Sequence, residues 1–202
     1  MKTILNLNSS IFGDDGQSSR LAEQFIAQFP AARVVRRDLS SSPLPHLDAE
    51  RFGAFLSKPE SRTPAQQQVL NDSDGLIAEL KEADTLVIGL PMYNFGIPSQ
   101  LKAYFDHVAR AGVTFKYTEK GAVGLLTGKK AYVFAARGGL YQGTPRDTQT
   151  AYVRDFLAFL GITDVQFVYA EGLAISEPTK VAALASAQSV LRNLAQPERI
   201  AA

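Results

Sequence analysis

Residues 85–102 constrain the fold of this chain more than any other stretch of the sequence. The segment opens with a short apolar run, residues 85–88, which predicts a buried strand over residues 85–90. Leu101, Tyr104 and Phe105 recur at helical spacing and predict an amphipathic helix after it. Between the two lies a loop with two prolines and with aromatic residues on both sides of an asparagine. Open α/β sheets bind ligands at strand-to-helix loops of this kind, so a site is expected here.

The rest of the sequence alternates in the same way between apolar strands and amphipathic helices. Further strands are predicted at residues 4–8, 32–39, 131–136 and 165–169, and helices from residues 17–18 onward, at 48–56, at 64–83, from 98 to 110, around 152–160 and at 178–194. Five strands that alternate with helices favour a parallel sheet with helices on both faces. This pattern predicts a flavodoxin-like three-layer sandwich with the strand order 2-1-3-4-5, in a single domain over residues 1–202.

Three local features refine this prediction. Pro98 is expected in the first turn of the helix that follows it, where a proline is tolerated. Residues 111–121 carry Phe115 and Tyr117 at alternate positions, which predicts a β-like excursion with two rings on one side. The tail after Pro197 is expected to fray.

The composition excludes several kinds of chemistry. The chain has no cysteine, so disulfides, thiolate nucleophiles and cysteine metal sites are ruled out. Its two histidines lie far apart, His46 in a predicted solvated loop and His107 on a predicted helix surface or inter-subunit contact. They supply neither a metal site nor a serine triad, and no metal is expected. A net charge of +1 without a basic run argues against nucleic acid and anionic membranes as partners. Without a signal-peptide pattern or an apolar run of about 20 residues, a cytoplasmic protein is expected.

Two further loops at the same edge of the predicted sheet carry features of a ligand site. The loop after the first strand is rich in hydroxyl groups and leads into a helix start near Gln17 and Ser18, where free N–H groups suit a phosphate. The alternative is that Ser18 or Ser19 is an ordinary N-cap. The loop after the fourth strand of the sheet holds Arg137 and two glycines, which offer a fixed cation and close backbone approach. The alternative there is a turn with a solvated arginine.

Together with the aromatic and asparagine loop, these two loops describe a site for a mononucleotide with a wide planar ring, namely FMN. Backbone N–H groups around Asn94 and Gly138 are placed to bond the pyrimidine edge of a flavin and tune its electronics. A dinucleotide held by a Rossmann fingerprint is disfavoured, because no G-x-G-x-x-G follows the first strand.

The same loops and their neighbours resemble a known family. The matching motifs stand at residues 8–10 with 17–18, at 91–95 running into 98–102 and Asp106, and at 109–115, 137–139, 159–162 and 170–172. In this order, over nearly the whole chain, they resemble the FMN-dependent NADH azoreductases, which are relatives of the flavodoxin-like quinone reductases. The block Met92-Tyr93-Asn94-Phe95 with its following helix is the most specific of these motifs.

The resemblance implies which residues contact FMN, held tightly and without a covalent bond. They are Ser10, Gly16, Gln17, Ser18, Met92, Tyr93, Asn94, Phe95, Ala136, Arg137, Gly138 and Gly139. A serine often stands in the family where this chain has Gly16 and Ala136. Backbone N–H contacts survive both changes, so FMN binding is expected to hold with a changed affinity.

The resemblance also implies a homodimer in which the partner chain completes each flavin site. Tyr117 and Phe159 look like the aromatic residues that flank the substrate in such a site. NADH or NADPH would deliver a hydride to flavin N5 and leave, and a quinone, an azo compound or a nitroaromatic would then stack on the same face and accept it. Because the cofactor carries the hydride, no catalytic side chain is assigned.

Two other functions stay open at this point. A flavodoxin-type electron carrier would bind FMN without turning over a small substrate, but such carriers tend to be acidic, and a net charge of +1 argues against one. A flavin-binding sensor is the second alternative. Steady-state oxidation of NADH with a quinone would separate a sensor from an enzyme.

Overall fold

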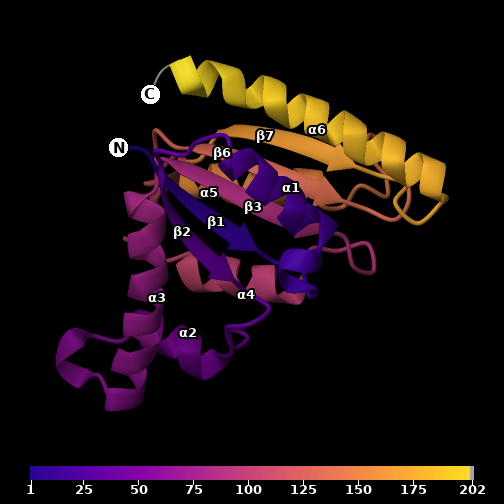
Figure 1. Ribbon diagram of the computed structural model, residues 1–202. Helices are drawn as coiled ribbons and strands as arrows, with labels where there is room; N and C mark the ends of the chain where they lie inside the picture. The colour runs from indigo at the N-terminus through magenta and orange to yellow at the C-terminus, as the bar shows by residue number, and fades with distance from the viewer. Residues whose placement is uncertain (201–202) are drawn as a thin grey trace.

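The computed structural model describes the backbone of residues 1–200 and the side chains of residues 1–196. A twisted sheet of parallel strands forms the centre of the molecule (Figure 1). Its strands, in spatial order, are β2 (Arg33–Asp38), β1 (Thr3–Asn8), β3 (Thr85–Pro91), β6 (Lys130–Ala136) and β7 (Asp164–Ala170). Counted along the chain, these five strands have the order 2-1-3-4-5, which is consistent with the predicted order.

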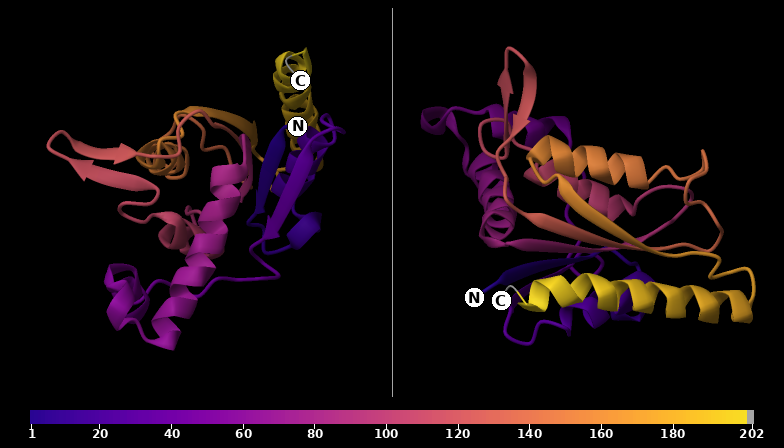
Figure 2. Two further views of the ribbon diagram at one scale, coloured as in Figure 1. Left: turned by 90° about the vertical axis from the view of Figure 1, so that its left-hand side faces the viewer. Right: turned by 90° about the horizontal axis from the view of Figure 1, so that it is seen from above.

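Helices lie on both faces of this sheet. The helices are α1 (Gln17–Ile26), α2 (Ala49–Leu56), α3 (Pro64–Glu82), α4 (Ser99–Val108), α5 (Thr150–Leu160) and α6 (Glu177–Ile200), and short 3-10 turns stand at Gly13–Asp15 and Pro59–Ser61. α1 and α6 cover one face, whereas α3, α4 and α5 cover the other (Figure 2). Side chains of β1 alternate between the two cores, Ile4 toward α1 and α6, and Leu5 and Leu7 toward the opposite layer. This alternation is the period-two geometry of a strand buried on both faces.

Local capping explains where several helices begin and end. Thr63 and Gln66 form a reciprocal capping box at the start of α3, with proline at the first helical position. Gly161 ends α5 with a φ of 101°, a conformation that glycine adopts without strain. Pro98 differs from its prediction, because it stands at the N-cap of α4 with extended backbone and the helix begins at Ser99.

Two further expectations are wrong. α6 continues to Ile200 instead of ending near Leu194 and fraying after Pro197, and only residues 201–202 lie outside the described backbone.

His107 is buried, not on a helix surface. Its Nδ1 donates to the carbonyl oxygen of Ala103 over 2.8 Å, and its ring meets Phe55 edge-on, so the imidazole takes part in packing α4 against α2.

A small hairpin projects from the body of the molecule (Figure 2). It consists of β4 (Phe115–Thr118) and β5 (Gly121–Gly124), paired antiparallel, which confirms the predicted β-like excursion. The hairpin is anchored on the carboxyl end of α5, where Leu126 N donates to Leu160 O over 2.8 Å. None of the helices in the described part of the chain is long and apolar enough to cross a membrane.

Candidate functional site

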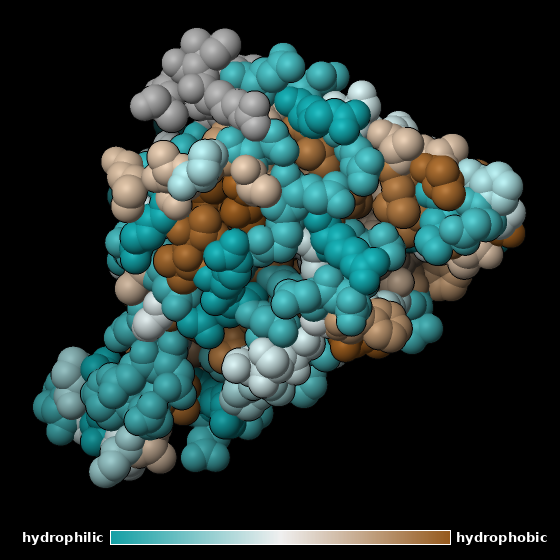
Figure 3. All heavy atoms as spheres, in the orientation of Figure 1, coloured by the Kyte–Doolittle hydropathy of each residue, from teal (hydrophilic) through white to brown (hydrophobic). Residues whose placement is uncertain are grey.

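Three loops meet at one rim of the sheet, because β1, β3 and β6 are neighbours and run in the same direction. This rim lies at the right-hand side of Figure 1, at the carboxyl ends of the strands. Large apolar side chains remain exposed on these loops, among them Phe12, Phe95 and Leu140. Hydrophobic surface is visible at the same end of the molecule in Figure 3. The predicted meeting of the three loops is therefore present in the fold.

The loop after β1 prepares the start of α1 for an anion. α1 has no side-chain cap, and its N-cap is Gly16, so the alternative of an ordinary serine cap is wrong. The first N–H groups of an α-helix have no partner within it. The Ser18 hydroxyl is fully buried and has no hydrogen-bond partner among the described residues. A buried unpaired donor beside free N–H groups at a positive dipole end is the donor set that a phosphate accepts.

Gly16 is required by packing in this chain. A Cβ on Gly16 would overlap the side chain of Ser10, which is itself buried. The sequence accounted for Gly16 only as a lost hydroxyl. The structure shows that the missing side chain leaves room for Ser10 against the start of α1, while Gln17 stays partly exposed as the first residue of the helix.

The loop after β3 contains a strained turn. Tyr93 and Gly96 exchange both of their backbone hydrogen bonds, and the residues between them, Asn94 and Phe95, have φ values of 50° and 65°. Two positive φ values between paired residues are typical of a type I′ turn, in which Asn is common and Phe is rare. Phe95 nevertheless holds this conformation with 52% of its surface exposed. Strain of about 1–3 kcal/mol at an exposed aromatic residue is typical of a functional site.

Hydrogen bonds tie this turn to the loops on both sides. The Tyr93 hydroxyl lies 3.4 Å from Ser10 Oγ and accepts from the Ile11 N–H over 3.3 Å. On the other side, the Met92 N–H, in a partly exposed residue, donates to the carbonyl oxygen of buried Ala136 over 3.2 Å. The three predicted loops therefore form one connected surface.

The prediction that Arg137 offers a cation to a ligand is wrong for its side chain. The residue is 1% exposed, so the alternative of a solvated arginine is wrong as well. Its guanidinium pairs with Asp147 at 2.8 Å and with Glu171 at 3.0 Å, and lies over the ring of Tyr169. Burial acts to raise the pKa of Asp147, but hydrogen bonds from Arg137 and Thr150 outweigh it and hold that pKa below its usual range.

The two glycines after Arg137 form an open shelf. Gly138 is exposed and Gly139 partly exposed. A Cβ on Gly139 would lie 2.6 Å from the Tyr141 hydroxyl, so a side chain there would displace that ring. Tyr141 in turn meets Phe95 edge-on, with 5.8 Å between ring centroids, which brings the loop after β6 against the strained turn.

Gln149 is a residue of the candidate site that could not be found from the sequence. It stands just before α5, is fully buried, and contacts both the strained turn and Arg137. No motif or periodicity marks it, because its role depends on three partners that are distant in sequence.

A groove of about 450 Å³ opens beside this region. It is lined by His46, Phe95, Gly96, Ile97, Ser99, Lys102, Thr148 and Tyr152.

Tyr117 and Phe159 lie together but away from the rim. Both rings contact Phe115, at centroid distances of 5.4 Å and 4.2 Å, and Tyr117 is 76% exposed. Phe159 stands at the carboxyl end of α5, which leads directly into the first residues of β7. That end of α5 is at the amino edge of the sheet. The fold therefore does not bring this pair to the three loops of its own chain.

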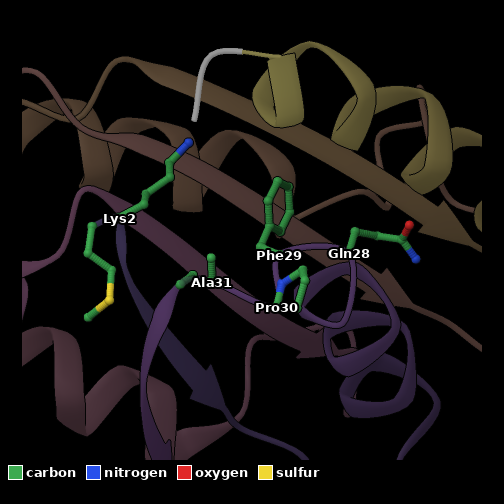
Figure 4. Close-up of a pocket in the computed structure, with 7 residues that line it drawn as sticks. Lys2, Gln28, Phe29, Pro30 and Ala31 are labelled. Carbon is green, nitrogen blue, oxygen red and sulfur yellow. The ribbon is translucent and has the colours of Figure 1, made fainter.

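A second cavity of about 450 Å³ also lies at the amino edge (Figure 4). Its lining residues are Met1, Lys2, Gln28, Phe29, Pro30, Ala31 and Ala32. The lining is mostly apolar and comes from the start of β1 and the segment between α1 and β2. The cavity is thus separate from the rim, and the loops after β1, β3 and β6 remain the candidate site.

Comparison with known proteins identifies the family of this chain. The sequence model of a family described as "Flavodoxin-like fold" matches residues 2–194. The fold and its rim thus define a flavodoxin-like protein. An FMN-dependent NADH:quinone oxidoreductase of Cellvibrio japonicus is 55% identical over 192 residues, which cover 93% of this chain and 96% of the relative. Another from Burkholderia lata, FMN-dependent NADH:quinone oxidoreductase 6, is 52% identical over 195 residues, 95% of this chain and 98% of the relative.

A solved structure extends the comparison to an azoreductase. The FMN-dependent NADH-azoreductase of Bacillus anthracis, solved in complex with FMN, superposes with a TM-score of 0.85 at 30% identity, over 96% of this chain and all of that one. The chain belongs to the family of the FMN-dependent NADH:quinone oxidoreductases. The family resemblance inferred from the sequence motifs is confirmed.

Proposed function

We propose that this chain is an FMN-dependent NAD(P)H oxidoreductase that reduces quinones and aromatic azo compounds. The observation that carries the proposal is the uncapped start of α1 with the buried, unpaired hydroxyl of Ser18. An unpaired buried hydroxyl costs free energy unless a ligand pairs with it. The names of the relatives, and the FMN bound in the azoreductase structure, support FMN as that ligand.

The chain offers FMN a phosphate cradle and a ring slot. Ser10, Gly16, Gln17 and Ser18 would hold the phosphate, and Met92, Tyr93, Asn94, Phe95, Ala136, Gly138 and Gly139 would hold the ring. The backbone N–H of Arg137 donates to Ala170 O and would not reach the ring. Arg137 would instead hold the loop at the ring slot in place through its ion pairs with Asp147 and Glu171. All of these residues belong to one domain, which we propose spans residues 1–202.

FMN, when bound, supplies hydride transfer between the dinucleotide and the acceptor, and we propose that NADH or NADPH leaves before the acceptor binds. The residues of the chain then have three tasks: to hold the cofactor, to keep one ring face open and to shape the space above it. The exposed ring of Phe95 and the shelf at Gly138 border that space. A flat space of this kind suits quinones, azo dyes and nitroaromatic compounds.

The chain is proposed to act as a homodimer. Tyr117 and Phe159 can flank a substrate only if they lie above a flavin, and in their own chain the 11 residues of α5 separate them from the rim. At 1.5 Å per residue this helix spans roughly 16 Å. A second copy can present the exposed Tyr117 to the rim of the first. Each site would then consist of a cradle from one chain and an aromatic pair from the other.

The first experiment is a visible absorption spectrum of the purified protein, followed by NADH and then by a quinone without oxygen. A flavin spectrum that bleaches with NADH and returns with quinone is the expected result. A spectrum that does not bleach would favour an electron carrier or a sensor. A protein that neither contains FMN nor takes it up would contradict the proposed function.

A further inference from the structure

Gln149 joins two of the three loops at the rim through a single buried amide. Its Nε2 donates one hydrogen bond to Pro91 O and another to Gly96 O, both over 2.9 Å. Its Oε1 accepts from Arg137 Nε over 3.1 Å. The side chain is fully buried, so water does not compete for these partners.

The two carbonyl oxygens stand at the two ends of the segment that contains the strained turn. Pro91 is the last residue of β3, and Gly96 closes the turn through its paired hydrogen bonds with Tyr93. By binding both ends, the amide fixes how far the segment between them projects from the sheet. A turn with two non-glycine residues at positive φ persists only where its surroundings hold it.

Only an uncharged amide of this length fits the three partners. The two N–H bonds of the amide point at two acceptors, while its oxygen meets a donor. A carboxylate would face two carbonyl oxygens with no proton to donate. A methionine would fill the same volume but make none of the three hydrogen bonds, so that Gly96 O would keep only its bond from the Tyr93 N–H. An asparagine is one methylene too short to reach all three partners.

We propose that Gln149 is a positioning residue for the flavin: it sets the spacing between the turn at residues 93–96 and the loop at 136–139. This inference rests on the proposed function, since these two segments are the walls of the proposed ring slot. Gln149 acts through Pro91, Gly96 and Arg137, and it does not touch the ring itself. Its loss would let the two walls move apart while the phosphate cradle at α1 stays intact.

The test compares Gln149→Met with Gln67→Met in the full-length protein. Gln67 is exposed on α3, and its amide donates to Asn71 Oδ1 over 2.8 Å, so the same substitution there is a matched control. For Q149M we expect the Kd for FMN to rise at least tenfold, with a shifted reduction potential and altered flavin absorption maxima. Q67M should match the wild type in all three. Binding is measured at a temperature at which circular dichroism shows each FMN-free variant to be folded.

A merely structural role would give a different result. Q149M would then unfold at a lower temperature but bind FMN with the wild-type Kd and potential, and this would overturn the inference. If Q149M does not yield folded protein, Gln149→Asn, which keeps the amide, is judged by the same measurements. A wild-type chain that takes up no FMN would overturn the proposed function together with this inference.

Discussion

Ser18 and Ser19 are adjacent and both buried, but they differ in whether their hydroxyl groups have a hydrogen-bond partner. Ser19 Oγ donates to Asn8 Oδ1 over 2.7 Å, whereas Ser18 Oγ is unpaired among the described residues. Removing a hydroxyl that has no partner in the FMN-free protein relieves a desolvation cost of about 1 kcal/mol. In the proposed complex, the FMN phosphate would give the Ser18 hydroxyl the hydrogen bond that it lacks among the described residues.

We expect Ser18→Ala to leave the FMN-free protein as stable as the wild type or up to about 1 kcal/mol more stable, and to weaken FMN binding about tenfold. Ser19→Ala is the control, because it removes a paired hydroxyl and should destabilise by about 1 kcal/mol. Urea unfolding and FMN titration of both variants check this. A loss of stability in S18A equal to that in S19A would contradict the assignment.

A second prediction at this scale concerns Asp147. Its pKa in the folded state lies below the usual value for Asp, about 3.9, so it stabilises the fold above that value. This stability should disappear as the pH falls through the lower, folded-state pKa. Asp147→Asn should cost about 3 kcal/mol at pH 7, because it breaks a buried pair with Arg137, and less at pH 3. Urea unfolding at several pH values measures the difference, and an equal loss at pH 7 and pH 3 would refute it.

The surroundings of individual side chains were the part of the structure that the sequence predicted least well. The placement of Ser10, Gln17 and Ser18 around the start of α1 follows from local pattern, because a hydroxyl-rich loop and a helix start are adjacent in the chain. The burial of Arg137 could not be predicted in this way. Its partners Asp147, Gln149 and Glu171 are 10–34 residues away and come together only when α5 and β7 pack.

At the scale of the elements, hydrophobic pattern was sufficient for nearly the whole sheet. Buried strands such as β3 and β6 have continuous apolar runs, and their predicted limits lie within a residue or so of those observed. The length of α6 was missed because a proline at position 197 signals a helix end by local propensity alone. The hairpin of β4 and β5 was predicted, but its contact with α5 was not.

That contact depends on two glycines that meet backbone to backbone. A Cβ on Gly124 in β5 would overlap the backbone at Gly161, the residue that ends α5. Gly124→Ala should therefore displace the hairpin and cost about 3 kcal/mol. Gly75→Ala in α3 is the control: apart from its chain neighbours and the backbone of its own helix, no atom of the described residues lies within 4 Å of that added Cβ, so the substitution should stabilise by about 1 kcal/mol. The midpoints of urea unfolding of the two variants measure these changes in stability, and equal effects at the two positions would contradict the packing described.

At the scale of the whole molecule, the proposed sharing of sites between chains can be tested by mixing two damaged chains. Ser18→Asp places a carboxylate in the proposed phosphate cradle and should abolish FMN binding, while the helix dipole tolerates the charge. Tyr117→Ala should keep FMN and change the preference among acceptors. In a mixed dimer, the cradle of the Y117A chain would meet the intact Tyr117 of the S18D chain.

Co-expression of these two chains should thus restore sites with the wild-type acceptor preference, measured as the ratio of quinone to azo-dye turnover. Each variant expressed alone is the control, S18D without FMN and Y117A with the altered ratio. A mixture that shows only the Y117A ratio would mean that each chain builds its complete site. Loss of FMN from Y117A would contradict its assignment to the substrate side.

The distance between the aromatic pair and the rim has a consequence for how the amount of working enzyme depends on the amount of chain. In the proposed assembly, a chain far from any other copy would carry its cofactor but would lack Tyr117 and Phe159 of a second copy above the flavin. Turnover per chain should then fall on dilution while the bound flavin remains. When chains are scarce, the number of complete sites would grow with the square of their concentration, so a modest rise in synthesis would give a disproportionate gain in reducing capacity.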